Sequence, residues 1–257
     1  MIFGFAGAGN MARAIALGWA RGDDGPENML FTDSGSGRAD ALAAEVGGGT
    51  RPTIPDLVAD SDAIVLAVKP AALDAVATDL RGAGIVVSVL GATTVERLRH
   101  ALPRATLLRT MPNVAVELRR GVICHASVPD DDREVLAPSI EALSLLGRMV
   151  ELPEDQLDAA TAVMGCMPAY IARVAGAVID SGERAGLERN LSTSLAADAI
   201  VGAGALLASH DATELERSIA SPGGSTEAGL DELSARNVAE AFEAAVAGSL
   251  ERMTGKR

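Results

Sequence analysis

The 257-residue sequence predicts an α/β fold in which a mainly parallel sheet comes first and an all-helical region follows. Two observations support this. Up to about residue 152, short β-type runs alternate with helical patterns, which is typical of βαβ units and a parallel sheet. After Pro153 no β-rich run follows, and apolar residues recur at helical spacing. We therefore expect one domain over residues 1–155 and a second over residues 156–257.

The expected elements follow from the same patterns, in chain order. Runs rich in Val, Ile, Leu and Met predict strands over residues 2–6, 29–32, 64–68, 85–89, 107–111, 122–125 and 149–152. Crossover helices are expected over residues 11–21, 38–46, 71–80, 95–102 and 133–146. Beyond residue 153, wide Ala-rich apolar faces predict long helices, with surface left to bury against a second copy of the chain.

Composition narrows the class of protein. With 48% hydrophobic residues but only one Trp, one Tyr and four Phe, the core is expected to hold close-packed small side chains rather than aromatic clusters. A net charge of −13 argues against nucleic-acid binding, which needs concentrated Lys and Arg. Cys124 and Cys166 are too few for a disulfide framework or a zinc site. The chain begins directly with a β-type run, and no apolar run is expected to reach membrane-spanning length, so we expect a cytoplasmic protein with no membrane partner.

A glycine-rich turn lies between the first expected strand and the first expected helix. It reads Gly7-x-Gly9-x-x-Ala12, in which Gly7 permits a tight turn and Gly9 lets the backbone approach a pyrophosphate. Ala12 permits close packing of the helix on the strand. An ordinary glycine turn in a Gly- and Ala-rich chain is the alternative, but the position at the start of a βαβ series favours a Rossmann-type dinucleotide-binding domain.

The end of the second strand reads TDSGSGR, where the adenosine ribose of a dinucleotide is expected. Asp33 could accept hydrogen bonds from both ribose hydroxyls, which favours NAD. Ser34, Ser36 and Arg38 could instead hold a 2′-phosphate, which favours NADP. The sequence leaves both alternatives open, so the expected cofactor is NADPH or NADH.

Two more motifs are expected at the carboxyl edge of the sheet, where ligands bind in open α/β folds. The AVKP motif places Lys69 there. The chain has two lysines, Lys69 and Lys256. Lys69 could contact the ligand or be a solvated side chain before Pro70. RTMPN places Asn113 there, whose amide could bond the nicotinamide carboxamide or cap the turn.

An obvious catalytic acid or base is missing from the sequence. We interpret His100, His125 and His210 as structural, because none has a partner at useful spacing. No cluster has metal-ligand spacing, so no metal is expected. A dinucleotide enzyme of this kind suits a substrate that is already electrophilic, such as a protonated imine.

The C-terminal half contains one conspicuous turn, SPGGST, between two helical stretches. It could be an N-capped interhelical turn, or its free amides could form an anion site at the start of the next helix.

Taken together, GAGNMARAI, AVKP, RTMPN, PAY at residues 168–170 and SPGGSTEAGL at residues 221–230 resemble the pyrroline-5-carboxylate reductase family. The resemblance covers essentially the whole chain, and the last motif is specific to that family. It implies reduction of L-1-pyrroline-5-carboxylate to L-proline by NAD(P)H, the last step of proline biosynthesis. It also implies a homodimer formed by interleaved C-terminal helices, with further assembly.

The resemblance also implies roles for individual residues. The pyrophosphate would be held by Gly7, Gly9, Asn10 and Met11, and the ribose and nicotinamide would be bordered by Ala67, Val68, Lys69 and Pro70. Asp33, Ser34 and Asn113 complete the expected cofactor site. The substrate carboxylate would be received by Ser221, Gly223, Gly224, Ser225 and Thr226, and the Thr226 hydroxyl would be the catalytic group near the ring nitrogen.

One segment departs from the family pattern. The family has a Ser-Gly-Ser-Gly run before Pro-Ala-Tyr, and this chain has Met164, Cys166 and Met167 there. Val114 and Ala115 also replace the commoner Pro or Thr after the MPN motif. A different cyclic imine or ketimine acid is therefore an alternative substrate. A non-catalytic NAD(P)-binding regulatory homologue is the alternative outside the enzymes.

Overall fold

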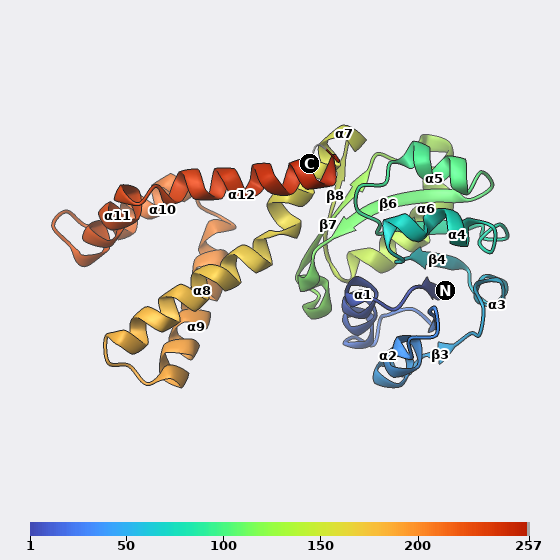
Figure 1. Cartoon of the computed structure of the whole chain (residues 1–257), viewed down its shortest axis with the longest axis horizontal. Helices are drawn as coiled ribbons and strands as arrows, with labels where there is room; N and C mark the ends of the chain where they lie inside the picture. Colours follow the sequence, from blue (N-terminus) through green and yellow to red (C-terminus); the bar gives the residue numbers. More distant parts are fainter. Residues whose placement is uncertain (256–257) are drawn as a thin grey trace. The chain divides into compact units, whose positions relative to one another are not determined.

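The structure is a computed structural model that describes residues 1–255, so Lys256 lies outside the described part. It divides into two compact units (Figure 1). The first comprises Met1–Cys166 with the C-terminal residues from Leu250, and the second comprises Met167–Ser249. The last strand ends at Leu152, and the predicted domain boundary after residue 155 lies between that strand and the division of the units.

The first unit contains one eight-stranded sheet with the order β3-β2-β1-β4-β5-β6-β7-β8. All neighbouring strands pair in parallel except β6 and β7, which are antiparallel. The mainly parallel sheet predicted from the sequence is therefore confirmed. The strands are β1 Ile2–Ala6, β2 Asn28–Thr32, β3 Gly49–Thr50, β4 Ala63–Leu66, β5 Ile85–Ser88, β6 Thr106–Pro112, β7 Gly121–Ala126 and β8 Gly147–Leu152.

Helices cover both faces of this sheet, because successive side chains of each strand point to opposite faces. Phe3, Phe5 and Val65 pack on one face with residues of α1, α2 and α6, whereas Ile64 and Leu66 pack on the other with residues of α3, α4 and α5. The helices are α1 Asn10–Ala20, α2 Arg38–Val46, α3 Ile54–Ala59, α4 Leu73–Ala77, α5 Val95–Ala101, α6 Asp130–Ser144 and α7 Glu154–Ala160, with short 3₁₀ turns η1 Pro70–Ala72 and η2 Val114–Leu118 and a π-helical turn η3 Thr161–Gly165.

An aromatic cluster lies in the first core, contrary to the expectation of small side chains alone. Phe3 and Phe5 of β1 contact Trp19 of α1 with ring centroids 4.6 and 5.9 Å apart, and Phe5 stacks on Phe31 at 4.8 Å. The indole N–H of Trp19 donates to the Ala142 carbonyl at 2.7 Å. The few aromatic residues converge because alternate positions of β1 and β2 point to the same face.

Within its described residues, the second unit contains only helices and the turns that join them, as predicted. It contains α8 Met167–Arg184, α9 Arg189–Leu207, α10 Ala212–Ile219, α11 Ser225–Ala235 and most of α12 Val238–Met253. The Tyr170 hydroxyl joins α8 to α12 through the Ala245 carbonyl and the Ser249 hydroxyl, at 3.2 and 2.8 Å. No hydrophobic side chain of α8, α10 or α11 is fully buried, so these helices keep apolar surface for a partner.

Two helical stretches, Glu154–Arg184 and Arg189–Leu207, are long and apolar enough to cross a membrane by length and composition alone. The expectation that no apolar run has this length was therefore wrong, because Ala-rich helices reach the threshold without long runs of large side chains. A helix that is buried in a protein interface passes the same test, so the finding is weak evidence for a membrane.

Candidate cofactor pocket and substrate turn

A pocket of about 460 Å³ lies at the carboxyl ends of β1, β2 and β4, where the strand order reverses beside β1. This is the position at which open α/β sheets bind dinucleotides. The pocket is lined by seven predicted cofactor residues: Gly7, Gly9, Asp33, Ser34, Ala67, Val68 and Lys69. Four other predicted residues, Asn10, Met11, Pro70 and Asn113, are absent from its lining.

The glycine turn has the geometry expected of a phosphate loop. Gly7 has a φ of +104°, and a Cβ there would lie 2.7 Å from the Ala67 carbonyl oxygen, so only glycine fits. A Cβ on Gly9 would meet nothing within 4 Å, so the space above this residue is open. Gly9 is the N-cap of α1 and supplies no side-chain cap, which leaves the first amides of the helix available to an anion.

Asp33 is committed to its own turn. One carboxylate oxygen accepts from the amides of Gly35 and Ser36, and the other accepts from the Ser36 hydroxyl and the amides of Arg38 and Ala39, all within 3.1 Å. The Ser36 hydroxyl and these amides lower the pKa of Asp33 to about 2. The carboxylate is therefore an acceptor that organises the turn, and the expected bonds to two ribose hydroxyls would compete with five existing ones.

The other polar groups of the turn remain exposed at the pocket. Ser34, Ser36 and Arg38 line it, and the Arg38 guanidinium has no ion-pair partner within residues 1–255. The chain curls here because Gly35 and Gly37 have φ values of +85° and +74°. Ser36 and Arg38, which belong to the 2′-phosphate alternative, therefore both lie at the pocket.

Three apolar pocket residues, Ile54, Ala72 and Val76, were not anticipated from the sequence. Ile54 opens α3, whose N-cap Thr53 accepts from the Asp56 amide at 3.2 Å. The Thr-x-x-Asp spacing with Pro55 is a helix-start signal that could have located this helix. Such side chains suit the apolar face of an adenine ring.

Lys69 and Pro70 lie three and four residues after the end of β4. Lys69 caps η1 through its backbone, since its carbonyl accepts from the Ala72 amide at 2.8 Å, and Pro70 occupies the first position of that turn. Lys69 lines the pocket, so a ligand contact and a solvated side chain both stay compatible with its position.

Both polar atoms of the Asn113 side chain make hydrogen bonds within the protein. Its side-chain nitrogen donates to the Met164 carbonyl at 3.2 Å, and its side-chain oxygen accepts from the Val122 amide at 3.3 Å. It is 8% exposed. This arrangement corresponds to the turn-stabilising alternative rather than to a free amide aimed at a nicotinamide.

The SPGGST turn lies in the second unit and begins α11. Gly223 has a φ of +74°, and Gly224 is the N-cap without a side-chain cap, so Ser225 and Thr226 are the first two helical residues. The Gly223 amide, one residue before the N-cap, donates to the Glu227 carboxylate at 2.7 Å and ties the turn to the first turn of the helix. Within residues 1–255 no acceptor is recorded for the amides of Ser225 and Thr226, and this helix start can receive an anion.

No group of three or more His, Cys, Asp or Glu residues within residues 1–255 could hold a metal ion. Of the three histidines, His125 is buried beside the Ala126 carbonyl, whereas His100 and His210 are exposed. None lines the pocket.

Comparison with known proteins covers both units. Residues 154–255 match a family model described as pyrroline-5-carboxylate reductase dimerisation, and residues 2–91 match one described as NADP oxidoreductase coenzyme F420-dependent. Pyrroline-5-carboxylate reductase of Thermus thermophilus is 31% identical over 98% of this chain and 97% of its own length. The enzyme of the same name from Pseudomonas aeruginosa is 34% identical over 96% of this chain and 92% of its own length.

Solved structures agree. A pyrroline carboxylate reductase of Plasmodium falciparum with NADP bound superposes with a TM-score of 0.85 at 25% identity, covering 99% of this chain and 97% of that chain. The Streptococcus pyogenes enzyme, at 23% identity and a TM-score of 0.89, covers 99% of this chain and 98% of that chain and supports the fold. On the full-length identity to the Thermus and Pseudomonas enzymes, the chain belongs to the pyrroline-5-carboxylate reductase family.

Proposed function

We propose that this protein reduces L-1-pyrroline-5-carboxylate to L-proline with NADPH or NADH. The observation that carries the proposal is the 31% identity to a pyrroline-5-carboxylate reductase over 98% of the chain, in a molecule that keeps a dinucleotide pocket and the SPGGST turn. The reaction needs hydride at the C=N carbon and a proton on the ring nitrogen. The bound nicotinamide supplies the hydride.

The residues of the chain mainly bind and orient the reactants, because a protonated cyclic imine is already electrophilic. The open space above Gly9 and the uncapped start of α1 would hold the pyrophosphate of the cofactor. The uncapped amides at Ser225 and Thr226 would receive the substrate carboxylate, and the Thr226 hydroxyl would then assist at the ring nitrogen. This explains how a chain of net charge −13 binds an acid without a dedicated arginine.

We also propose a preference for NADPH over NADH. Asp33 would select NAD, but both of its carboxylate oxygens already accept hydrogen bonds from its own turn. Arg38 and Ser34 line the same pocket, and a guanidinium with a hydroxyl suits a 2′-phosphate, whereas the Ser36 hydroxyl donates to Asp33.

The protein is proposed to act in the cytoplasm as a homodimer of its C-terminal helices, which assembles further. The match of residues 154–255 to a dimerisation model supports the homodimer.

A second substrate is favoured by one feature, the segment with Met164, Cys166 and Met167. A bulkier or less polar cyclic imine acid would suit thioether side chains. A panel of cyclic imine and ketimine acids, followed by NADPH absorbance, separates the two: the main proposal requires the highest kcat/KM for pyrroline-5-carboxylate.

The biological test is complementation of a proline-requiring bacterial strain. The intact chain is expected to restore growth without proline, and Gly7→Val is expected not to, since its side chain would collide with the Ala67 carbonyl. An expressed, folded wild-type chain that fails to restore growth would contradict the proposal and favour a non-catalytic NAD(P)-binding homologue.

A further inference from the structure

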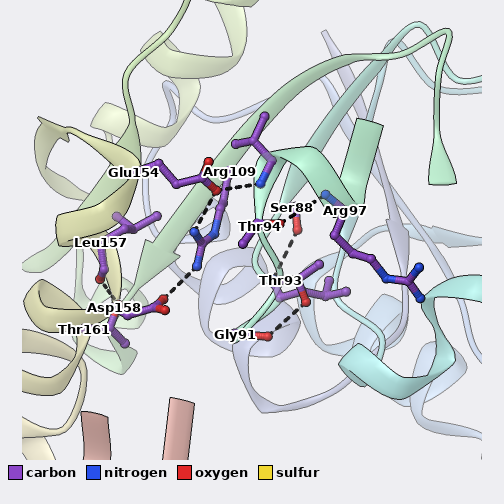
Figure 2. Close-up of polar contacts among 12 residues, drawn as sticks. Ser88, Gly91, Thr93, Thr94, Arg97, Arg109, Glu154, Leu157, Asp158 and Thr161 are labelled. Atoms are coloured by element: carbon purple, nitrogen blue, oxygen red, sulfur yellow. Dashed lines mark hydrogen bonds and ion pairs between the residues drawn. The ribbon is translucent and has the colours of Figure 1, made fainter. Parts of the chain in front are cut away.

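Arg109 is a buried cation outside the cofactor pocket. It lies in β6 and is 2% exposed. Its two terminal nitrogens donate to different carboxylates of α7: Nη1 to Glu154 at 2.9 Å and Nη2 to Asp158 at 2.7 Å. Figure 2 shows this side chain pointing from β6 toward α7, between the two acids. The RTMPN motif thus contains a guanidinium to which the proposed reaction assigns no role.

Stability alone is a weak reason for this cluster. Removing charges from water is expensive, and replacing a buried ion cluster by apolar side chains is often neutral or stabilising. The Nε atom of Arg109 is also buried without a hydrogen-bond partner within the described residues, which adds a cost. A geometric role accounts for the cluster better, because a planar fork on two carboxylates of α7 fixes β6 relative to α7, and the bond from the Val95 amide to Glu154 extends this link to α5.

The first contact reaches the turn after β5. Glu154 Oε1, which accepts from Arg109, also accepts from the Val95 amide at the start of α5 at 2.6 Å. In this turn Ala92 has a φ of +53°, a left-handed conformation that non-glycine residues adopt only when the surroundings hold them. The Thr93 hydroxyl donates to the Gly91 carbonyl at 3.0 Å. The cluster therefore helps to hold a strained turn.

This turn lies at the functional edge of the sheet. β5 pairs with β4 in parallel, with Leu66 opposite Ser88, and the Val89 amide donates to the Leu66 carbonyl at 3.1 Å. The turn after β5 therefore borders Ala67 and Val68, which line the cofactor pocket. A dinucleotide with its adenosine at β2 extends over the carboxyl ends of the neighbouring strands toward β5 and β6.

The second contact reaches the segment after α7. Asp158 lies one turn before the π-helical turn η3, and π-helical turns occur frequently at functional sites. Met164 of η3 accepts from Asn113, four residues after Arg109 in the chain. The β6 segment therefore holds this stretch at two points, by Arg109 at one end and by Asn113 at the other.

We propose that Arg109 is a positioning residue for hydride transfer: its bridge to Glu154 and Asp158 fixes the Ala92 turn and the end of β6, and these hold the nicotinamide end of the cofactor in place. The inference rests on the proposed function, since it assigns the residues that orient the hydride donor.

The test is Arg109→Lys in the full-length protein, because a lysine keeps the charge but cannot bridge two carboxylates as a fork. We expect kcat for NADPH and pyrroline-5-carboxylate to fall about 10- to 100-fold. Both KM values should stay within about threefold of wild type. The primary deuterium isotope effect on kcat, with cofactor labelled at the transferred hydride, should rise because chemistry becomes more limiting.

The matched control is Arg97→Lys. Arg97 lies on α5 and pairs with Asp74 at the surface, and Figure 2 shows it pointing away from the Arg109 cluster. It should leave kcat and the isotope effect unchanged. The proposal is overturned if folded Arg109→Lys has a kcat within about twofold of wild type, or if both variants lose rate equally.

Two alternative experiments cover a variant that does not fold and a wild type that does not turn over. If Arg109→Lys does not fold, Glu154→Gln and Asp158→Asn replace it, and wild-type kcat in both would overturn the inference. If wild type itself does not turn over, the proposed function fails separately. Hydrogen exchange of the Val95 amide then tests the inference: it should be about tenfold or more faster in Arg109→Lys than in Arg97→Lys, and equal exchange would overturn it.

Discussion

At the scale of single residues, the carboxylate of Asp33 organises the adenosine end of the pocket. Its pKa is lowered to about 2 by the Ser36 hydroxyl and by backbone amides, below the roughly 3.9 of an unfolded aspartate. A lowered folded pKa means that the stabilisation is complete above the unfolded pKa and is lost as pH falls through the folded one.

Asp33→Asn is therefore expected to lower the unfolding temperature at pH 5 and to approach wild type as pH falls from about 4 to about 2. Thermal unfolding at several pH values measures this. The matched control is Asp40→Asn, which removes an exposed carboxylate from the first turn of α2, the helix that follows the Asp33 turn. A constant difference between Asp33→Asn and wild type down to pH 2 would contradict the linkage.

Arg38 tests the proposed cofactor preference at the same scale. Arg38→Ala should raise KM for NADPH about 10- to 100-fold, the loss of a charge-assisted contact to phosphate, and should change KM for NADH little. Arg104→Ala, an exposed arginine outside the cofactor pocket, is the control. Equal effects of Arg38→Ala on both cofactors would show that Arg38 does not contact a 2′-phosphate.

At the scale of elements, the start of α11 is expected to bind the substrate. Thr226→Ala should lower kcat about 10²- to 10⁴-fold if its hydroxyl assists protonation of the ring nitrogen, while the unfolding free energy changes by less than about 1 kcal/mol. Thr213→Ala provides a close control, because Thr213 is the second residue of α10 as Thr226 is of α11. Equal kcat in both variants would make the SPGGST turn a structural N-terminus.

Gly224 in the same turn has little room for a side chain. A Cβ on Gly224 would lie 2.7 Å from the Ser221 hydroxyl and 2.9 Å from its carbonyl oxygen. We therefore expect Gly224→Val to distort the turn as well as to obstruct its amides. The KM for the substrate should rise, and the unfolding temperature should fall. Normal stability with a raised KM would show that the turn accommodates the side chain.

How far the elements could be predicted depended on their length. Strands such as β1 and helices such as α2 are long enough for their period to be read, and both were predicted with the observed bounds. The two-residue β3 and the six-residue α3 are too short for a period, and α3 carries the pocket residue Ile54.

The site was predictable where chemistry is local in sequence. Gly7, Gly9 and the residues Ala67, Val68 and Lys69 line the pocket because each lies within three residues of the end of a parallel strand. Arg109 could not be assigned a role, since its partners lie 45 and 49 residues away. Asp33 could not be read as a turn residue because its bonds depend on the left-handed conformations of Gly35 and Gly37.

At the scale of the whole molecule, apolar side chains exposed on the C-terminal helices predict association. Leu195 on α9 is 52% exposed, and Val135 on α6 of the first unit is 46% exposed. Leu195→Glu should shift the mass measured by sedimentation toward the 26.2 kDa monomer, whereas Val135→Glu should leave it unchanged. A wild-type monomer, or an unaltered dimer in Leu195→Glu, would contradict the role of this face.

Reduction of a cyclic imine acid with a nicotinamide cofactor is the function proposed for the whole molecule. The most direct measurement is NADPH oxidation by the purified protein with L-1-pyrroline-5-carboxylate, with L-proline identified as the product. We expect one L-proline for each NADPH oxidised, and a higher kcat/KM with NADPH than with NADH. Protein that binds NADPH but forms no L-proline at any pH at which it is folded would contradict it.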